Sequence, residues 1–101
     1  MIFIYTTCQN QEEAKKIGKL IIEKKLAGCV NVWPIDSIYP WKGEIKEDDE
    51  AVLLIKTSEA KLQEIEDLIQ SNHSYSVPCI ASIDIHRINR PYKEWLAQYI
   101  E

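Results

Sequence analysis

The pattern of apolar and polar positions along the chain predicts four strands. Residues 2–7 (IFIYTT) and 51–57 (AVLLIKT) are short apolar, β-branched and aromatic runs, typical of strands that are covered on both faces. Residues 79–86 (CIASIDIH) alternate instead, and His86 lies on their more polar face. The remaining strand-like segment, residues 30–45, is the least regular.

Residues 30–45 (VNVWPIDSIYPWKGEI) contain many strand-forming residues but are interrupted by Pro34 and Pro40. Proline has no N–H and cannot donate to a β-ladder, so we expect a bent strand here rather than a regular central one. Three large aromatic side chains on one interrupted segment indicate an interface with another molecule. They are Trp33, Tyr39 and Trp41. The alternative is an exposed, kinked hairpin whose aromatic residues pack on their own subunit.

Helical spacing of apolar positions predicts three helices. The first begins at Asn10, which forms a capping-box pattern with Glu13, and we expect Gly28 to stop it. The second has its apolar stripe at Leu62, Ile65, Leu68 and Ile69. Pro91 suits the first position of the last helix, whose apolar positions are Tyr92, Trp95, Leu96 and Tyr99.

The order β-α-β-β-α-β with an extra C-terminal helix predicts a single α+β domain, residues 1–101, with the ferredoxin-like split βαβ arrangement. Right-handed crossovers place both main helices on one face of an antiparallel sheet. Residues 2–7 and 51–57 lie in the middle, so their second apolar face needs another cover. The last helix covers part of it, and a further subunit would cover the rest, which predicts a homo-oligomer. Residues 46–49 (KEDD) are expected to form a tight turn.

Composition narrows the class of protein. Twelve basic and sixteen acidic side chains give a net charge of −4 without a basic stripe, so we expect no nucleic-acid partner. The apolar runs are too short for a membrane span, so we expect no membrane partner and a cytoplasmic location. Cys8, Cys29 and Cys79 cannot all pair within the chain and are expected to be free thiols.

Several separated motifs resemble the CutA divalent-cation-tolerance family over nearly the whole chain. They are YTTC (5–8), LAGCVNV (26–32), SIYPWKGEI (37–45), Glu50 with LLIKT (53–57), HSYSVP (73–78) and YKEW (92–95). The resemblance implies a ferredoxin-like subunit in a tight homotrimer whose long, bent second strand reaches across to its neighbours. Interface positions would then include Trp33, Tyr39, Trp41 and Trp95.

The resemblance also implies divalent metal tolerance, notably of copper. The soft or borderline ligands in the chain are Cys8, Cys29, Cys79, His73 and His86. None has the C-x2-C or H-x3-H spacing of a structural zinc site. Cys29 is better interpreted as a small buried core residue, Cys8 is ambiguous between ligand and core, and His86 has the alternative of a solvated or hydrogen-bonded surface histidine.

The pair His73 and Cys79 is the stronger candidate for a metal site. Compared with the family pattern, Ser74 replaces a proline, Ser76 replaces an acid, and Cys79 follows the Val-Pro pair. A thiolate beside an imidazole favours copper(I) or zinc(II), so we expect weak metal binding at His73 and Cys79, with His86 as a further candidate. The alternative is that Cys79 is a buried strand residue.

No enzyme is predicted. The chain lacks both G-x-x-x-x-G-K-[ST] and G-x-S-x-G, and its three glycines cannot form a phosphate cradle. Copper is a possible ligand rather than an obligatory cofactor. The alternative function is a PII-like trimeric small-molecule sensor. That class carries a long mobile loop after the second strand, whereas only KEDD is expected between the strands here.

Overall fold

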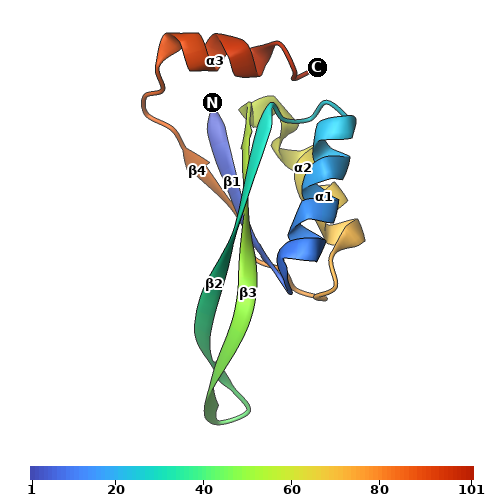
Figure 1. Ribbon diagram of the computed structural model, residues 1–101, viewed down its shortest axis with the longest axis vertical. Coiled ribbons are helices and arrows are strands. Elements are labelled where there is room, and N and C mark those ends of the chain that lie inside the picture. Colours follow the sequence, from blue (N-terminus) through green and yellow to red (C-terminus); the bar gives the residue numbers. More distant parts are fainter.

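The computed structural model describes residues 1–101 and is an α+β fold with the expected β-α-β-β-α-β order and a last helix (Figure 1). Its elements are β1 (Ile2–Cys8), α1 (Gln11–Glu23), β2 (Cys29–Trp41), β3 (Glu44–Thr57), a 3-10 turn (Glu59–Lys61), α2 (Leu62–Asn72), β4 (Ile80–Asp84) and α3 (Arg90–Ala97). No helix is both long enough and apolar enough to cross a membrane.

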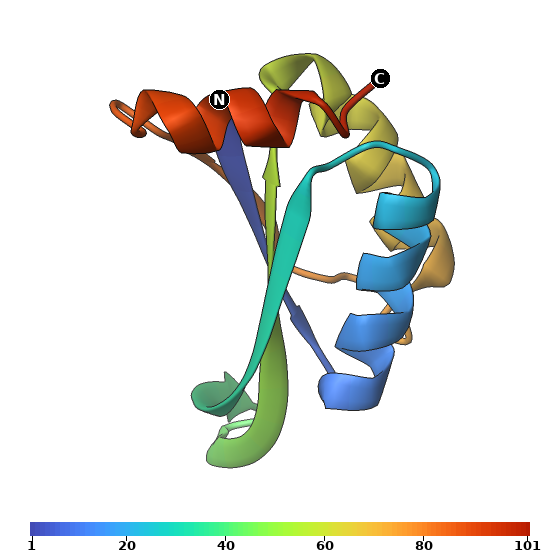
Figure 2. The ribbon, with the colours of Figure 1, turned by 45° about the horizontal axis from the view of Figure 1, so that its top comes forward.

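The four strands form one antiparallel sheet in the order β2-β3-β1-β4, so the two apolar runs are central, as predicted. Figure 2 shows α1 and α2 together on one face of this sheet, while α3 lies across its end. The core lies between the sheet and these two helices. Its largest buried side chains include Ile4, Leu53 and Ile55 from the strands and Ile17, Ile21, Ile65 and Ile69 from the helices.

The expectation that residues 30–45 are not a central strand is confirmed, since β2 is an edge strand, but Pro34 and Pro40 do not interrupt it as expected. β2 pairs with β3 along its whole length, with Pro34 opposite Ala51 and Pro40 opposite Ile45. Because β2 is an edge strand, a missing N–H on its outer side costs no ladder hydrogen bond. β2 therefore continues, paired with β3, beyond the part of the sheet that contains β1 and β4.

The turn after β2 lies at Lys42 and Gly43, and the prediction of a KEDD turn is wrong. Both turn residues have positive φ, 51° and 83°, as in the two-residue turns whose twist matches that of a β-hairpin. Residues 46–49 therefore belong to β3. Only residues 51–57 of β3 pair with β1, so residues 35–50 form a free two-stranded extension, here called the hairpin arm. The arm accounts for much of the 47 Å long axis (Figure 1).

Gly28 does not end α1, because the helix stops at Glu23 and Lys25 takes the left-handed conformation with φ 58°. Gly28 instead touches α3. A Cβ at this position would lie 2.7 Å from Leu96 Cδ2 and 2.9 Å from the Leu96 carbonyl oxygen. The glycine is therefore required for α3 to dock, and the buried Leu96 marks the contact.

Candidate metal centre

Three potential metal ligands meet where β1 ends, α1 begins and α2 ends. They are Cys8, Glu13 and His73, and their ligand atoms all lie within 4.8 Å of one another. Cys8 is buried, the His73 side chain is completely buried, and the Glu13 side chain is 16% exposed. The fold brings them together because the split βαβ order returns the end of α2 to the point where β1 passes into α1.

Both ring nitrogens of His73 are hydrogen bonded. Nε2 lies 2.8 Å from the carbonyl oxygen of Thr7, and Nδ1 lies 3.0 Å from the backbone N of Tyr75. A carbonyl can only accept and a backbone N–H can only donate, so the ring is the neutral tautomer with its proton on Nε2. The imidazole thereby fixes the segment after α2 against the end of β1.

The Glu13 carboxylate is the second organising group. One oxygen accepts a hydrogen bond from the backbone N–H of Gln9, and the other accepts one from the N–H of Ser74, each at 2.9 Å. Burial tends to raise the pKa of Glu13, but these hydrogen bonds favour the ionised form and hold the pKa below its ordinary value. Glu13 is thus an anion that ties the start of α1 to the segment after α2.

The Cys8 thiol is kept protonated by its surroundings. Burial, followed by the nearby carboxylates of Glu13 and Glu50, raises the pKa of Cys8 to about 12. A metal ion at this point would have to displace that proton, because the thiolate is the form that ligates.

A second chain of contacts leads from this centre to the hairpin arm. The Tyr75 ring lies against the His73 ring, with a centroid separation of 4.9 Å, and its hydroxyl donates to Glu50 at 2.7 Å. Burial and the Glu50 carboxylate raise the pKa of Tyr75 above its ordinary value, so the phenol remains a donor. The centre and the arm are therefore joined through one side chain.

The structure separates the metal ligands predicted from sequence. His73 belongs to the centre, but Cys79 is exposed and His86 is exposed in the loop after β4, and neither is in the group of converging ligand atoms. Cys29 is half-buried at the start of β2. Sequence reasoning overlooked Glu13, whose capping-box role concealed it. One signal could have revealed the site: in the predicted fold, the end of the first strand, the start of the first helix and the end of the second helix lie at the same edge.

The predicted interface residues are partly open in the single chain. Trp33, Trp41 and Trp95 are 41%, 54% and 43% exposed, whereas Tyr39 is half-buried and its hydroxyl donates to Asp48. The arm also exposes Ile38 and Ile45, at 67% and 81%. These exposed apolar side chains are the feature expected of a surface that packs against another molecule.

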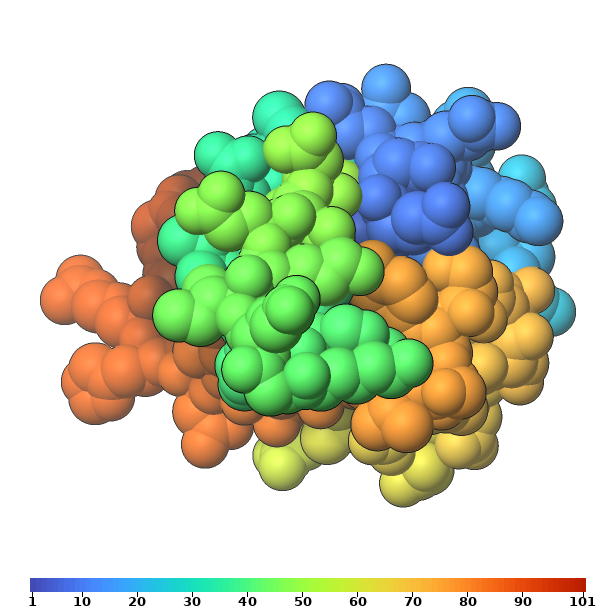
Figure 3. All heavy atoms as spheres, turned by 90° about the horizontal axis from the view of Figure 1, so that it is seen from below, coloured from blue at the N-terminus to red at the C-terminus, as the bar shows by residue number.

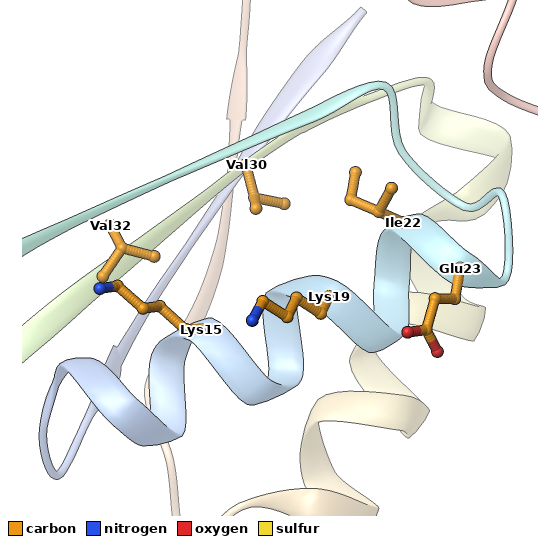
Figure 4. A pocket seen from close by; sticks show the side chains of 6 residues that line it. All are labelled: Lys15, Lys19, Ile22, Glu23, Val30 and Val32. Carbon is orange, nitrogen blue, oxygen red and sulfur yellow. The ribbon is translucent and has the colours of Figure 1, made fainter.

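A groove lies between α1 and β2 (Figure 4). Its floor is formed by Val30 and Val32, and Lys15 and Lys19 extend over it from α1. Lysine stems commonly cover apolar surface in this way while keeping the ammonium in water. The groove contains no cluster of soft ligands, so it is not a candidate metal site.

Comparison with known proteins identifies relatives over almost the whole chain. The CutA1 divalent ion tolerance protein family matches residues 2–99. The chain is 40% identical over 99 residues to the divalent-cation tolerance protein CutA of Archaeoglobus fulgidus, which covers 98% of this chain and 97% of that protein. It is also 40% identical over 98 residues to human Protein CutA, where the match covers 96% of this chain but 55% of the human protein.

Solved structures show the same fold. The periplasmic divalent cation tolerance protein CutA from Archaeoglobus fulgidus superposes with a TM-score of 0.95 at 40% identity, over 100% of both chains. CutA1 from Pyrococcus horikoshii gives 0.95 at 34% identity, over 100% of this chain and 99% of the other. The PII-like protein CutA from Nostoc sp. PCC 7120, in apo form, gives 0.90 at 27% identity, over 100% and 98%.

Proposed function

Because the chain belongs to the CutA1 divalent ion tolerance protein family, we propose that it binds a soft or borderline metal ion, copper or zinc, at Cys8, Glu13 and His73. The observation that carries this proposal is the convergence of a thiol, a carboxylate and an imidazole within 4.8 Å. This proposal keeps His73 from the sequence prediction. It replaces Cys79 and His86 with Glu13 and with Cys8, the last residue of β1.

The donor set fits such an ion. A thiolate and an imidazole are the ligands that copper and zinc prefer, and three protein ligands with an open fourth position are typical of accessible zinc sites. Donor atoms around a tetrahedral zinc lie about 3.3–3.8 Å apart, so ligand atoms up to 4.8 Å apart need to close by about 1 Å. Ligation through Nδ1 of His73 would displace the N–H of Tyr75, so metal binding would move the segment after α2.

We extend the proposal to a homotrimer without catalytic activity in the cytoplasm. The open edges of the sheet, β2 and β4, and the exposed apolar residues of the arm support assembly. Three free thiols suit a reducing compartment. The family is described by ion tolerance rather than by a reaction.

Zn²⁺ titration of the reduced protein tests the metal site, since zinc has no redox chemistry that could oxidise the thiols. Calorimetry should show that Cys8→Ala and Glu13→Gln each weaken Zn²⁺ binding at least about tenfold, as expected for loss of a ligand. The matched controls are Cys79→Ser and His86→Asn, which remove an exposed thiol and an exposed imidazole and should leave the affinity unchanged. If only the controls lose affinity, the metal binds at the exposed residues and the proposed centre is wrong.

The PII-like sensor remains the second candidate because one structural relative is described as PII-like. In this chain β2 and β3 are joined by a two-residue turn and form an ordered arm rather than a long loop. We therefore expect ATP and ADP to give no heat of binding in the same calorimeter. Saturable nucleotide binding would favour the sensor.

A further inference from the structure

The groove between α1 and β2 lies away from the hairpin arm and from the uncovered face of the sheet. None of its lining residues belongs to the arm, residues 35–50. Val30 pairs with Ile55, which is fully buried beneath the helices, so Val30 and Val32, two positions on, face the helical layer. Seen from below, α1 (blue) lies at the outer surface, to one side of the arm (green) (Figure 3).

The groove is large enough for a small organic molecule, and its wall is mainly apolar. Its volume is about 400 Å³, within the range of small-ligand sites. Val30 and Val32 form the floor, and Ile22, which is 38% exposed, adds apolar surface near the end of α1. The helix packs closely on this floor, since a Cβ on Gly18 would lie 3.0 Å from Val30 Cγ2. The apolar wall is therefore held by packing between a helix and a strand.

Two lysines of α1 bring positive charge to the groove without a partner. Lys15 and Lys19 lie four positions apart on one face of the helix, and neither takes part in an ion pair. Glu23 also lines the groove, but both ammonium groups extend away from it (Figure 4). Like charges at this spacing destabilise a helix, so an anion bound between the two lysines would relieve their repulsion.

The surrounding sequence adds to this positive field. Residues 15–25 contain five lysines and one glutamate, although the whole chain has a net charge of −4. Among these lysines only Lys25 forms an ion pair, with Glu101 at 3.3 Å. The helix therefore attracts anions to a protein that otherwise repels them. A bare inorganic anion would meet the charges but leave the valine floor exposed, so the groove suits an anion with an apolar body.

From these observations we infer that the groove binds a small organic carboxylate with an alkyl body. The carboxylate would lie between the ammonium groups of Lys15 and Lys19. The alkyl chain would cover Val30 and the exposed part of Ile22. This site is additional to ion tolerance, and it shares no residue with the metal centre.

Octanoate, octanamide and acetate test the proposal, because octanamide keeps the chain without the charge and acetate keeps the charge without the chain. Binding to the full-length protein, as it assembles in solution, is followed by the methyl NMR signals of Val30 and Val32. Val30→Ile and Val32→Ile variants assign these signals. Octanoate should shift them saturably and bind at least about fivefold more tightly than either analogue, because only octanoate uses both the charges and the floor. The absence of a shift, or equal affinity for one analogue, would overturn the proposal.

Lys15→Gln and Lys16→Gln form the matched pair, because they remove the same charge at adjacent positions of one helix and only Lys15 lines the groove. Both side chains are exposed, so neither change threatens the fold. Lys15→Gln should weaken octanoate binding at least about threefold, and Lys16→Gln less than about 1.5-fold. If both variants weaken it equally, only the general positive field of α1 attracts octanoate and the proposed site is wrong.

A double variant tests whether the two lysines together hold the carboxylate. With both Lys15→Gln and Lys19→Gln in place, octanoate should bind no more tightly than octanamide, because the floor remains and the charges at the groove are gone. Octanamide itself should bind the double variant as it binds the wild type. If the double variant still prefers octanoate, the carboxylate is held elsewhere and the inference is overturned.

Discussion

Glu13 shows how one side chain acquires two roles from its position. As the third residue of the first helical turn, its backbone N–H donates to the Asn10 side chain at 2.9 Å, while its carboxylate accepts from Gln9. The same carboxylate also reaches Ser74, 61 positions along the chain. A local capping residue thereby becomes a long-range tie between the two helical halves of the fold.

The lowered pKa of Glu13 gives a pH prediction for the metal-free protein, measured with a chelator present. A carboxyl whose pKa is lower in the folded than in the unfolded state contributes stability that is present above its ordinary value, 4.5, and is lost as the pH falls through the folded value. Glu13→Gln should lower the free energy of unfolding at pH 7 by about 1 kcal/mol, since charge-assisted hydrogen bonds are weakened. The deficit should vanish in acid.

Urea unfolding of both proteins between pH 3 and pH 7 checks this. Glu12 is the matched control, because it is an exposed neighbour in the same helical turn. Glu12→Gln should follow the wild-type curve over the whole range. A constant difference between wild type and Glu13→Gln at every pH would show that the carboxylate acts by packing and not by charge.

At the residue scale, the sequence predicted the roles of individual residues better than it predicted which residues contact one another. The Asn10–Glu13 cap and the free thiols were predicted, and the cap and the thiols are present. The convergence of Cys8 and Glu13 with His73 was not predicted, because His73 is at least 60 positions away from the other two in sequence. Spacing motifs report only ligands that lie close together in sequence, so a centre built from three element ends leaves no such motif.

At the scale of elements, the strands and helices were predicted well and their ends were not. The two central strands followed from doubly apolar runs, and the sheet order confirms them. The arm was not predicted because the prolines were taken to interrupt the pairing of residues 30–45, although the predicted sheet order already placed that segment at an edge, where proline is tolerated. The turn was misplaced because polar KEDD outweighed the shorter signal of Lys42 and Gly43, whose positive φ values form the actual turn.

Gly28 provides the element-scale prediction, because it is the point where α3 meets the start of β2. Gly28→Ala would place a Cβ 2.9 Å from a backbone oxygen and 3.0 Å from the Cα of Leu96, and a helix backbone cannot yield as a side chain can. We expect a loss of about 1–3 kcal/mol in the free energy of unfolding, the usual cost of overpacking. Hydrogen exchange of the α3 amides should also become faster.

Gly18→Ala is the control for Gly28→Ala. Its added Cβ would meet side-chain atoms only, Val30 Cγ2 at 3.0 Å and Leu53 Cδ1 at 3.2 Å, and alanine favours the helix by about 1 kcal/mol. We therefore expect a small change in stability and unchanged exchange in α3. If Gly28→Ala melts like wild type and α3 stays protected, then α3 has room to move and the contact with Leu96 is not needed for docking.

At the scale of the whole molecule, the single chain is an elongated body with a partly uncovered surface. Its core is complete on the helical face, where Ile4 and Ile55 are fully buried. The opposite face is only half-buried at positions such as Tyr5 and Leu54 in the central strands, and the arm extends beyond any layer that could cover it. An arm that exposes several large apolar side chains is costly in a monomer and reasonable in an assembly.

The last prediction concerns that assembly. Light scattering at micromolar concentration should give three chain masses, and heating should dissociate and unfold the protein in one step, as expected when an interface resembles a divided core.

Ile45→Lys tests whether the arm forms the interface. Ile45 is 81% exposed in the single chain, so a monomer would lose almost no stability when it is replaced. In a trimer the same change would bury an ammonium against apolar surface, lower the mass measured at micromolar concentration and make the melting temperature depend on concentration. Ile22→Lys is the matched control, because Ile22 is an exposed isoleucine on the helical face, 38% exposed, and should leave the mass unchanged. A wild-type mass of one chain, or an Ile45→Lys variant with an unchanged mass and melting curve, would mean that the arm stands free in solution and that its exposed apolar residues have another purpose.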